Sequence, residues 1–114
     1  MKNPIRPQHC AKKLHALAAP ERLRILCFLR DGARNVTEIA EMLDTPAVNV
    51  SHHISVLRQA GIVRGHKAGR FVYYSLTPGL LQRDEVRDGV EYFDLGCCRL
   101  EVPRASPSAV TEST

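Results

Sequence analysis

The fold is decided by residues 35–76, which read NVTEIAEMLDTPAVNVSHHISVLRQAGIVRGHKAGRFVYYSL. Asn35 and Glu38 have the spacing of a capping box, in which each side chain accepts a hydrogen bond from the other residue's backbone N–H. The short helix that they begin is broken at Pro46, and a second helix continues to Gly61, which can adopt the left-handed conformation that ends helices. The pattern predicts two consecutive helices joined by a tight turn.

A hairpin is predicted directly after the second helix. Residues 62–66 and 71–76 have the alternation and the β-branched or aromatic content of strands. Residues 67–70 join them, and Gly69 can take the positive φ that a tight hairpin turn needs. The stretch is therefore interpreted as a helix-turn-helix followed by an antiparallel hairpin, or wing.

The second helix has two different faces. At about 100° per residue, Val50, Ile54 and Leu57 gather on one side, which we expect to be buried. The opposite side and its flanks are small and polar, with little charge, whereas a merely solvated helix tends to carry Glu and Lys. Such a face is typical of a helix that lies against base edges in the DNA major groove. Its residues are Val48, Asn49, Ser51, His52, Ser55, Arg58 and Gln59.

The distribution of charge favours a polyanionic partner. All 12 acidic residues lie outside the segment from Thr45 to Arg83, although that segment contains several basic side chains. Two of them, Lys67 and Arg70, lie at the predicted tip of the hairpin. A cationic tip beside a groove-reading helix suits contact with DNA phosphates.

The 114 residues suffice for one domain with tails. We expect a flexible N-terminus over residues 1–7, a folded domain over residues 8–102 and a disordered tail, rich in Ser, Thr and Pro, over residues 103–114. Two helices precede residue 35, and a last helix is expected to begin after Thr77-Pro78. The prediction is a mainly α fold in the order α-α-α-α-β-β-α, which dimerises through its first and last helices.

Composition limits the compartment and the class of protein. No apolar run approaches membrane-spanning length, and the N-terminal residues lack the apolar region of a signal peptide. We therefore expect a cytoplasmic protein with no membrane partner, whose four cysteines are reduced thiols, sensors or ligands instead of a disulfide framework. No Ser/His/Asp or Cys/His arrangement stands out, so we do not expect an enzyme.

Two segments, LAAPERLRILCFLRDG and VTEIAEMLDTPAVNVSHHISVLRQAGIVRGHKAGRFVYYSL, resemble the ArsR/SmtB family of bacterial winged-helix repressors over about residues 14–76. The resemblance implies a homodimer that binds a near-palindromic operator in double-stranded DNA. It also implies release of the DNA when a metal ion, a metalloid or a thiol-modifying signal is sensed. The implied DNA-binding residues are Val48, Asn49, Ser51, His52, Ser55 and Arg58, with Lys67 and Arg70 on the wing.

Two effector sites of this family do not carry over. Metal sensors often have Cys-x-Cys in the first helix of the helix-turn-helix, where this chain has no cysteine. Zinc sensors use Asp and His pairs on the last helix, where this chain has no histidine. Cys27, however, stands where persulfide-sensing members carry a reactive thiol, and Cys97 and Cys98 lie where such members have their second cysteine.

The adjacent thiols of Cys97 and Cys98 favour a soft ion such as As(III), Cu(I) or Cd(II). Two thiols do not close such a site, so a third ligand is expected, either Cys10 or His9 from the first helix of the neighbouring subunit. The alternative is a disulfide or polysulfide bridge from Cys27 to Cys97 or Cys98, although Cys27 also suits packing among leucines.

The leading hypothesis is a dimeric DNA-binding repressor that needs no cofactor to fold and leaves its operator when As(III) or another soft ion binds its cysteines. A persulfide- or redox-sensing repressor is the alternative within this class. A winged helix that binds proteins instead of DNA, or a metallochaperone, is the alternative from other classes. DNA footprinting distinguishes a DNA-binding repressor, which protects a site, from a winged helix that binds only proteins.

Overall fold

The computed structural model describes residues 6–103 of the chain. The predicted tails, residues 1–7 and 103–114, therefore lie largely outside the described residues. None of the helices in the described part has the length and apolar character that a membrane crossing requires.

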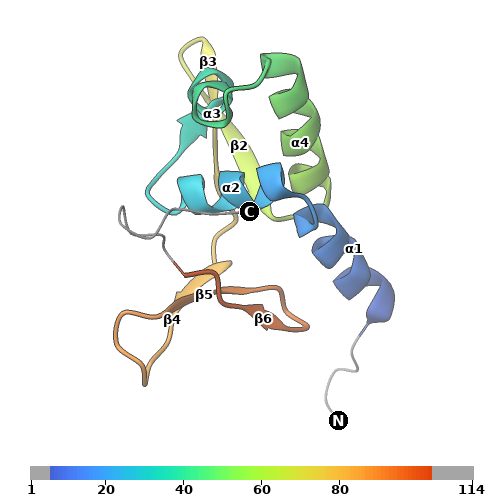
Figure 1. Ribbon diagram of the computed structural model, residues 1–114, viewed down its shortest axis with the longest axis vertical. Coiled ribbons are helices and arrows are strands. Elements are labelled where there is room, and N and C mark those ends of the chain that lie inside the picture. Colours follow the sequence, from blue (N-terminus) through green and yellow to red (C-terminus); the bar gives the residue numbers. More distant parts are fainter. Residues whose placement is uncertain (1–5, 104–114) are drawn as a thin grey trace.

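Helices form the first part of the fold, with α3 and α4 at the top of Figure 1 and α1 extending down beside the C-terminal strands. Their bounds are Pro7–Leu17 for α1, Pro20–Leu29 for α2, Val36–Leu43 for α3 and Ala47–Gln59 for α4. The predicted capping box is confirmed, because the Asn35 side chain accepts from the Glu38 N–H at 2.9 Å and Glu38 accepts from the Asn35 N–H at 3.0 Å. Asp44, with φ 54°, ends α3. Helix α4 begins at Ala47 with Pro46 as its N-cap, so it starts one residue later than predicted.

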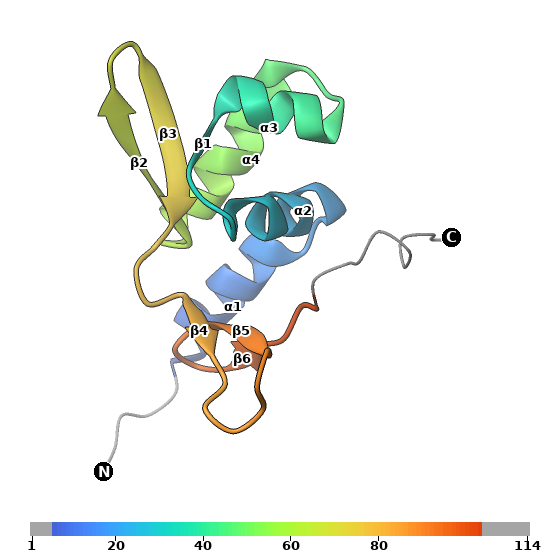
Figure 2. The ribbon, with the colours of Figure 1, turned by 90° about the vertical axis from the view of Figure 1, so that its left-hand side faces the viewer.

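The wing is confirmed as an antiparallel sheet beside α3 and α4 (Figure 2). Strands β2 (Val63–Ala68) and β3 (Phe71–Leu76) pair along their whole length, and the short β1 (Arg34–Asn35) adds to the other side of β3. The turn is tighter than predicted, because only Gly69, with φ 64°, and Arg70 connect the two strands. Lys67 therefore belongs to β2 and lies just before the tip.

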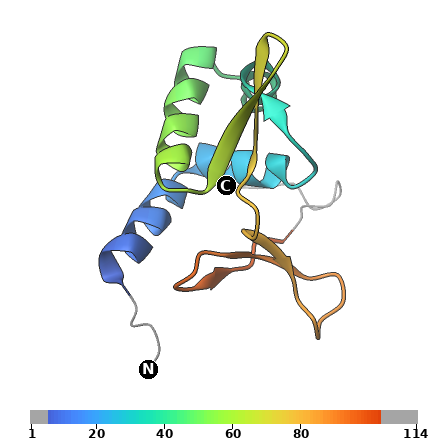
Figure 3. The same ribbon diagram turned by 180° about the vertical axis from the view of Figure 1, so that it is seen from behind.

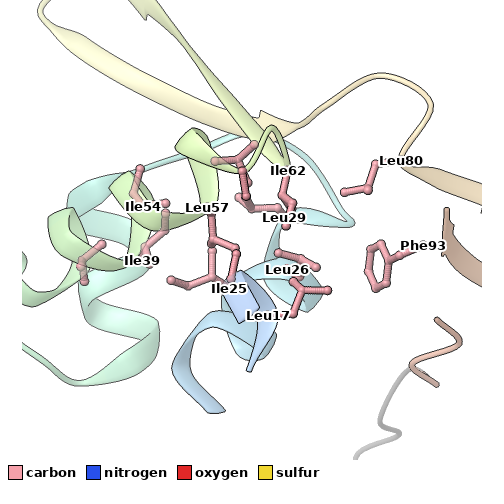
Figure 4. Close-up of a cluster of buried hydrophobic side chains, with 14 of the residues drawn as sticks. Leu17, Ile25, Leu26, Leu29, Ile39, Ile54, Leu57, Ile62, Leu80 and Phe93 are labelled. Carbon is pink, nitrogen blue, oxygen red and sulfur yellow. The ribbon is translucent and has the colours of Figure 1, made fainter. Parts of the chain in front are cut away.

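One contiguous core of buried apolar side chains holds the helices and the wing together (Figure 4). Ile25 and Leu26 of α2 and Leu57 of α4 have no exposed surface. Phe93, far along the chain, is equally buried and extends this core toward the C-terminal segment. Burying one such side chain stabilises the fold by roughly 2–3 kcal/mol. The predicted buried face of the second helix, Val50, Ile54 and Leu57, is confirmed.

The predicted last helix is wrong. The segment forms a second antiparallel sheet of three short strands, β4 (Leu81–Arg83), β5 (Glu91–Asp94) and β6 (Arg99–Leu100), in the order β4-β5-β6. This C-terminal sheet lies at the opposite end of the molecule from the tip of the wing (Figures 1 and 2). Among residues 6–103, therefore, no last helix is present to form half of a dimer interface.

The physical reason for the error is the set of glycines in this segment. Gly79, Gly89 and Gly96 have φ of 89°, 82° and 89°, a backbone conformation that a helix does not contain. At Pro78-Gly79 the Leu80 N–H donates to the Thr77 carbonyl at 3.0 Å, which is the pattern of a type II turn instead of a helix start. The apolar residues of this segment, such as Leu80 and Phe93, are buried in the core instead of forming one face of a helix.

Arg30 fastens the C-terminal sheet to the helices. Its side chain is only 1% exposed, and its Nη2 donates to the Val102 carbonyl. Its guanidinium carbon lies 5.0 Å from the centroid of the Phe93 ring, and its Nε lies 4.0 Å from the Glu91 carboxylate. A cation over an aromatic face in a dry setting is attracted strongly to the ring, so Arg30 joins α2 to β5 and to the chain after β6.

Candidate nucleic-acid interface and cysteine cluster

The polar face of α4 is open to solvent along most of its length. Val48 is 73% exposed, and Asn49, Ser51, His52 and Arg58 are also exposed or partly exposed. Because these side chains are exposed on one face of α4, one ligand could contact both the apolar Val48 and the hydrogen-bonding groups around it. A methyl-bearing side chain among short polar ones matches the mixture of thymine methyl groups and base-edge donors and acceptors in a major groove.

Two of the predicted residues have local partners. Ser55 is half-buried, and its hydroxyl accepts from the Gln59 amide at 3.4 Å. The Asn49 amide donates to the Thr45 hydroxyl at 3.3 Å, one turn earlier. Both contacts are exposed and join residues four apart in sequence, so they orient the side chains without removing them from the face.

The wing supplies exposed cations, two of them at or beside its tip. Lys67 and Arg70 are exposed, as is Arg64 at the start of the hairpin. The first turn of α4 and the tip of the β2–β3 hairpin lie at the same end of the molecule (Figures 1 and 3). Because the segment from Thr45 to Arg83 contains no acid, no carboxylate within it opposes the approach of a phosphate.

Behind the exposed face, Arg22 connects three helices. Its Nε donates to the Ala16 carbonyl at the end of α1 at 2.6 Å, and its Nη1 lies 3.1 Å from His53 Nδ1 on α4. Burial, followed by the nearby charge of Arg22, lowers the pKa of His53. His53 is therefore held in the neutral form, which accepts a hydrogen bond from Arg22. The sequence pattern did not predict the contact between His53 and Arg22, because it joins residues 31 positions apart.

The cysteine cluster brings together residues from the two ends of the chain. Cys10, in the first turn of α1, forms a disulfide with Cys97, 87 residues further on. The Cys98 sulfur lies 3.8 Å from that of Cys97, and the three sulfurs all lie within 4.8 Å of one another. All three residues are half-buried. Cys10 and the vicinal pair thus belong to one chain, whereas the sequence suggested that the third ligand comes from the neighbouring subunit.

The turn between β5 and β6 places the vicinal pair. The Asp94 carboxylate accepts from the Gly96 N–H at 2.9 Å, and the Leu95 N–H donates to the Cys98 carbonyl at 2.9 Å. Lys13 of α1 donates to the Leu95 carbonyl at 3.1 Å. The turn therefore points toward the beginning of α1, as Figures 1 and 3 show.

Two expectations about the cysteines are corrected by this geometry. The expectation of reduced thiols, sensors or ligands instead of disulfides does not hold for Cys10 and Cys97 in this structure, because these two sulfurs are bonded. Cys27 remains a free thiol and is not part of the cluster. It lines a separate open pocket of about 470 Å³ with Leu23, Phe28 and Met42 on one part and charged side chains such as Arg24 and Asp31 on another. The apolar part of this lining suits packing of the thiol.

Comparison with known proteins agrees with the winged helix-turn-helix. Residues 19–64 match the family described as "Bacterial regulatory protein, arsR family". NmtR of Mycobacterium tuberculosis is 48% identical over 66 residues, which are 58% of this chain and 55% of that protein. The transcriptional repressor SdpR of Bacillus subtilis is 37% identical over 67 residues, which are 59% of this chain and 74% of that protein.

A solved structure also has the winged helix-turn-helix fold. The homodimeric winged helix-turn-helix DNA-binding domain of Mb0332 from Mycobacterium bovis superposes with a TM-score of 0.60 at 30% identity, covering 62% of this chain and 66% of that one. The fold is thus that of DNA-binding regulators. The chain belongs to the arsR family of bacterial regulatory proteins. The prediction that it is not an enzyme agrees with that family, whose members are regulators.

The matched region is only part of each protein. The chain spans about half the length of NmtR, at 55%. The family match ends at residue 64, before the second strand of the wing and well before the cysteine pair. The C-terminal sheet with Cys97 and Cys98 is therefore the part of this chain for which the family match gives no template.

Proposed function

We propose that this protein is a transcriptional repressor that binds double-stranded DNA through α4 and the β2–β3 wing. The observation that carries this proposal is the exposed, nearly uncharged face of α4, which begins at the same end of the molecule as the cationic tip of the wing. The proposed base-reading residues are Val48, Asn49, Ser51, His52, Ser55 and Arg58. Lys67 and Arg70 would bind phosphates.

The repressor would act as a homodimer. One α4 helix reads only a few base pairs, whereas two copies related by a two-fold axis read both halves of a palindromic operator about 34 Å apart. The homodimeric state of the Mb0332 domain supports this assembly. Because the described part of the chain has no helix after α4, the proposed interface involves α1 and the surfaces beside it. Leu14 on α1 is a large apolar residue with 44% of its surface exposed, which suits such a contact.

A soft metal or metalloid at Cys10, Cys97 and Cys98 is the proposed effector. Thiolates prefer soft, thiophilic ions, and three sulfurs within 4.8 Å can converge on one centre. Within the described part of the chain, no histidine or carboxylate joins these three sulfurs. A trithiolate set fits As(III), which accepts three ligands, better than Zn(II), which takes four. The Cys10–Cys97 disulfide must be reduced before such an ion can bind, which the reducing conditions of a cytoplasm would allow.

DNA binding is tested by footprinting on sheared genomic DNA, followed by affinity measurements on the protected site. His52→Ala is expected to weaken specific binding by roughly 10-fold and to leave non-specific binding nearly unchanged, since base contacts are each worth about 1–3 kcal/mol. Gln8→Ala, on exposed α1, is the matched control. If the protein protects no site, or if His52→Ala and Gln8→Ala behave alike, the reading role of α4 is contradicted.

The effector is tested in a titration of the reduced complex with arsenite, Cd(II) and Zn(II). We expect arsenite to release the DNA at the lowest concentration and Cys98→Ser to abolish that release, while Cys27→Ser retains it. Release by Zn(II) alone, or loss of the response in Cys27→Ser, would contradict the proposed site.

A further inference from the structure

We propose that the cysteine cluster senses two different signals through one linkage. An oxidant closes the Cys10–Cys97 disulfide, and a three-coordinate thiophilic ion bridges the same two sulfurs together with Cys98. Both events fasten the beginning of α1 to the turn between β5 and β6. The inference rests on the repressor function proposed above and adds oxidant sensing to it.

Both signals would join the same two parts of the fold. Cys10 lies on α1, whereas Cys97 and Cys98 lie on the β5–β6 turn, and the chain separation between the bonded cysteines is 87 residues. Any covalent or coordinate link from Cys10 to this turn therefore closes the same long loop. The disulfide in the structure therefore closes the same loop that an ion bound to Cys10, Cys97 and Cys98 would close. Without either link, α1 and this turn still share the hydrogen bond from Lys13 to the Leu95 carbonyl and the core that contains Leu95, Ala16 and Leu17, but no bond holds the beginning of α1 at Cys10.

The two reactions are chemically distinct and balanced. In the oxidation, the thiols of Cys10 and Cys97 lose two electrons and two protons, which convert a hydroperoxide into an alcohol and water as the S–S bond forms. In the metalloid reaction, three thiols replace the three hydroxyl groups of arsenous acid, forming three S–As bonds and releasing three water molecules with no change of oxidation state. Cys98 takes part only in the second reaction.

Contacts at the far end of α1 connect the linkage with the DNA-binding helix. Ala16 and Leu17 are buried in the core, so the end of α1 is fixed against its neighbours. The Ala16 carbonyl accepts from Arg22, whose other nitrogen contacts His53 of α4. Fastening the beginning of α1 limits the orientations of the whole helix, and Arg22 transmits the restraint to α4. Coupling through packed elements of this kind typically changes affinity about 5- to 150-fold.

The test uses the full chain and the DNA site found by footprinting. Each variant is reduced and is then treated with the thiol oxidant diamide or with arsenite, and its DNA affinity is compared with that of its own reduced, untreated form. In the unmodified chain we expect each treatment to weaken binding by at least about 10-fold. Cys98→Ser should lose the arsenite response and keep the diamide response. Cys10→Ser should lose both, and the control Cys27→Ser should keep both.

Several outcomes would overturn the inference. The first is an oxidised chain, with the Cys10–Cys97 bond verified by peptide mass mapping, that binds DNA as tightly as the reduced chain. The second is a Cys98→Ser variant that loses both responses or keeps both. The third is a mass map in which diamide joins a different pair of cysteines.

A readout without DNA separates this inference from the proposed function. Amide hydrogen exchange in α1 should slow by a similar factor in the disulfide form and in the arsenite-bound form, relative to the reduced chain. If the exchange slows in both forms but the reduced chain binds no DNA, the repressor function fails while the shared linkage stands. If arsenite binding leaves the exchange of α1 at the reduced level, the shared linkage is contradicted whatever the DNA affinity is.

Discussion

Arg22 and His53 are joined by a contact of 3.1 Å between a guanidinium nitrogen and an imidazole nitrogen, directly behind the exposed face of α4. Because a guanidinium is always a donor, the imidazole nitrogen must accept, which requires neutral His53. The position of α4, the proposed DNA-reading helix, is thus tied to the protonation state of one partly buried histidine.

This relationship predicts how stability depends on pH. Burial and Arg22 lower the pKa of His53 below its ordinary value of 6.5. Between the folded-state pKa and 6.5, the unfolded chain binds more protons, so the free energy of unfolding falls as the pH falls through this window. The stabilising contribution is complete above 6.5. Urea unfolding at several pH values should show this loss, and His53→Gln should reduce it. His15→Gln, at an exposed site, is the control.

Gly79→Ala discriminates between the observed sheet and the helix that the sequence suggested. In a helix, replacing glycine by alanine stabilises the protein by up to about 1 kcal/mol. At Gly79, with φ 89°, an alanine side chain is strained, and we expect a loss of about 1 kcal/mol instead. The free energy of unfolding from urea titration measures the sign. A stabilised Gly79→Ala variant would show that the segment after Pro78 is helical.

Arg30→Met should loosen the C-terminal sheet. The substitution keeps the apolar stem but removes the hydrogen bond to Val102 and the cation over Phe93, so we expect a loss of about 2 kcal/mol in stability. Limited proteolysis should then cut first within residues 84–90, the loop between β4 and β5. Arg83→Met, on the surface of β4, is the matched control. Equal stability of the two variants would contradict the anchoring role of Arg30.

Lys67→Ala should reduce the salt dependence of DNA binding. Each phosphate contact that the substitution removes lowers the slope of log affinity against log salt by about 1. Lys12→Ala removes the same charge from exposed α1, at a distance from the wing, and should leave the slope unchanged. Identical slopes for the two variants would show that the wing does not bind phosphate.

Local signals predicted the part of the fold that belongs to the family. The capping box at Asn35 and Glu38, the apolar side of α4 and the glycine in the wing each depend on neighbours within a few residues, and all three are confirmed. For the same reason, the partition of α4 into a buried and an exposed face was predictable.

The rest depends on contacts between distant residues. Leu81 pairs with Phe93 across two strands, and no local periodicity records that pairing. The joining of Cys10 to Cys97 within one chain likewise follows only from the three-dimensional path of the C-terminal segment. The turn at Pro78-Gly79 was recognisable, because Pro followed by Gly is typical of a type II turn, but the Thr-Pro pair before it also suits a helix start.

The affinity of the reduced protein for its footprinted site, measured from low to physiological salt, tests the central claim most directly. Several phosphate contacts per dimer predict a loss of about 10³-fold in affinity between about 50 and 200 mM salt. An affinity that stays nearly constant over this range would contradict DNA binding through α4 and the cationic wing.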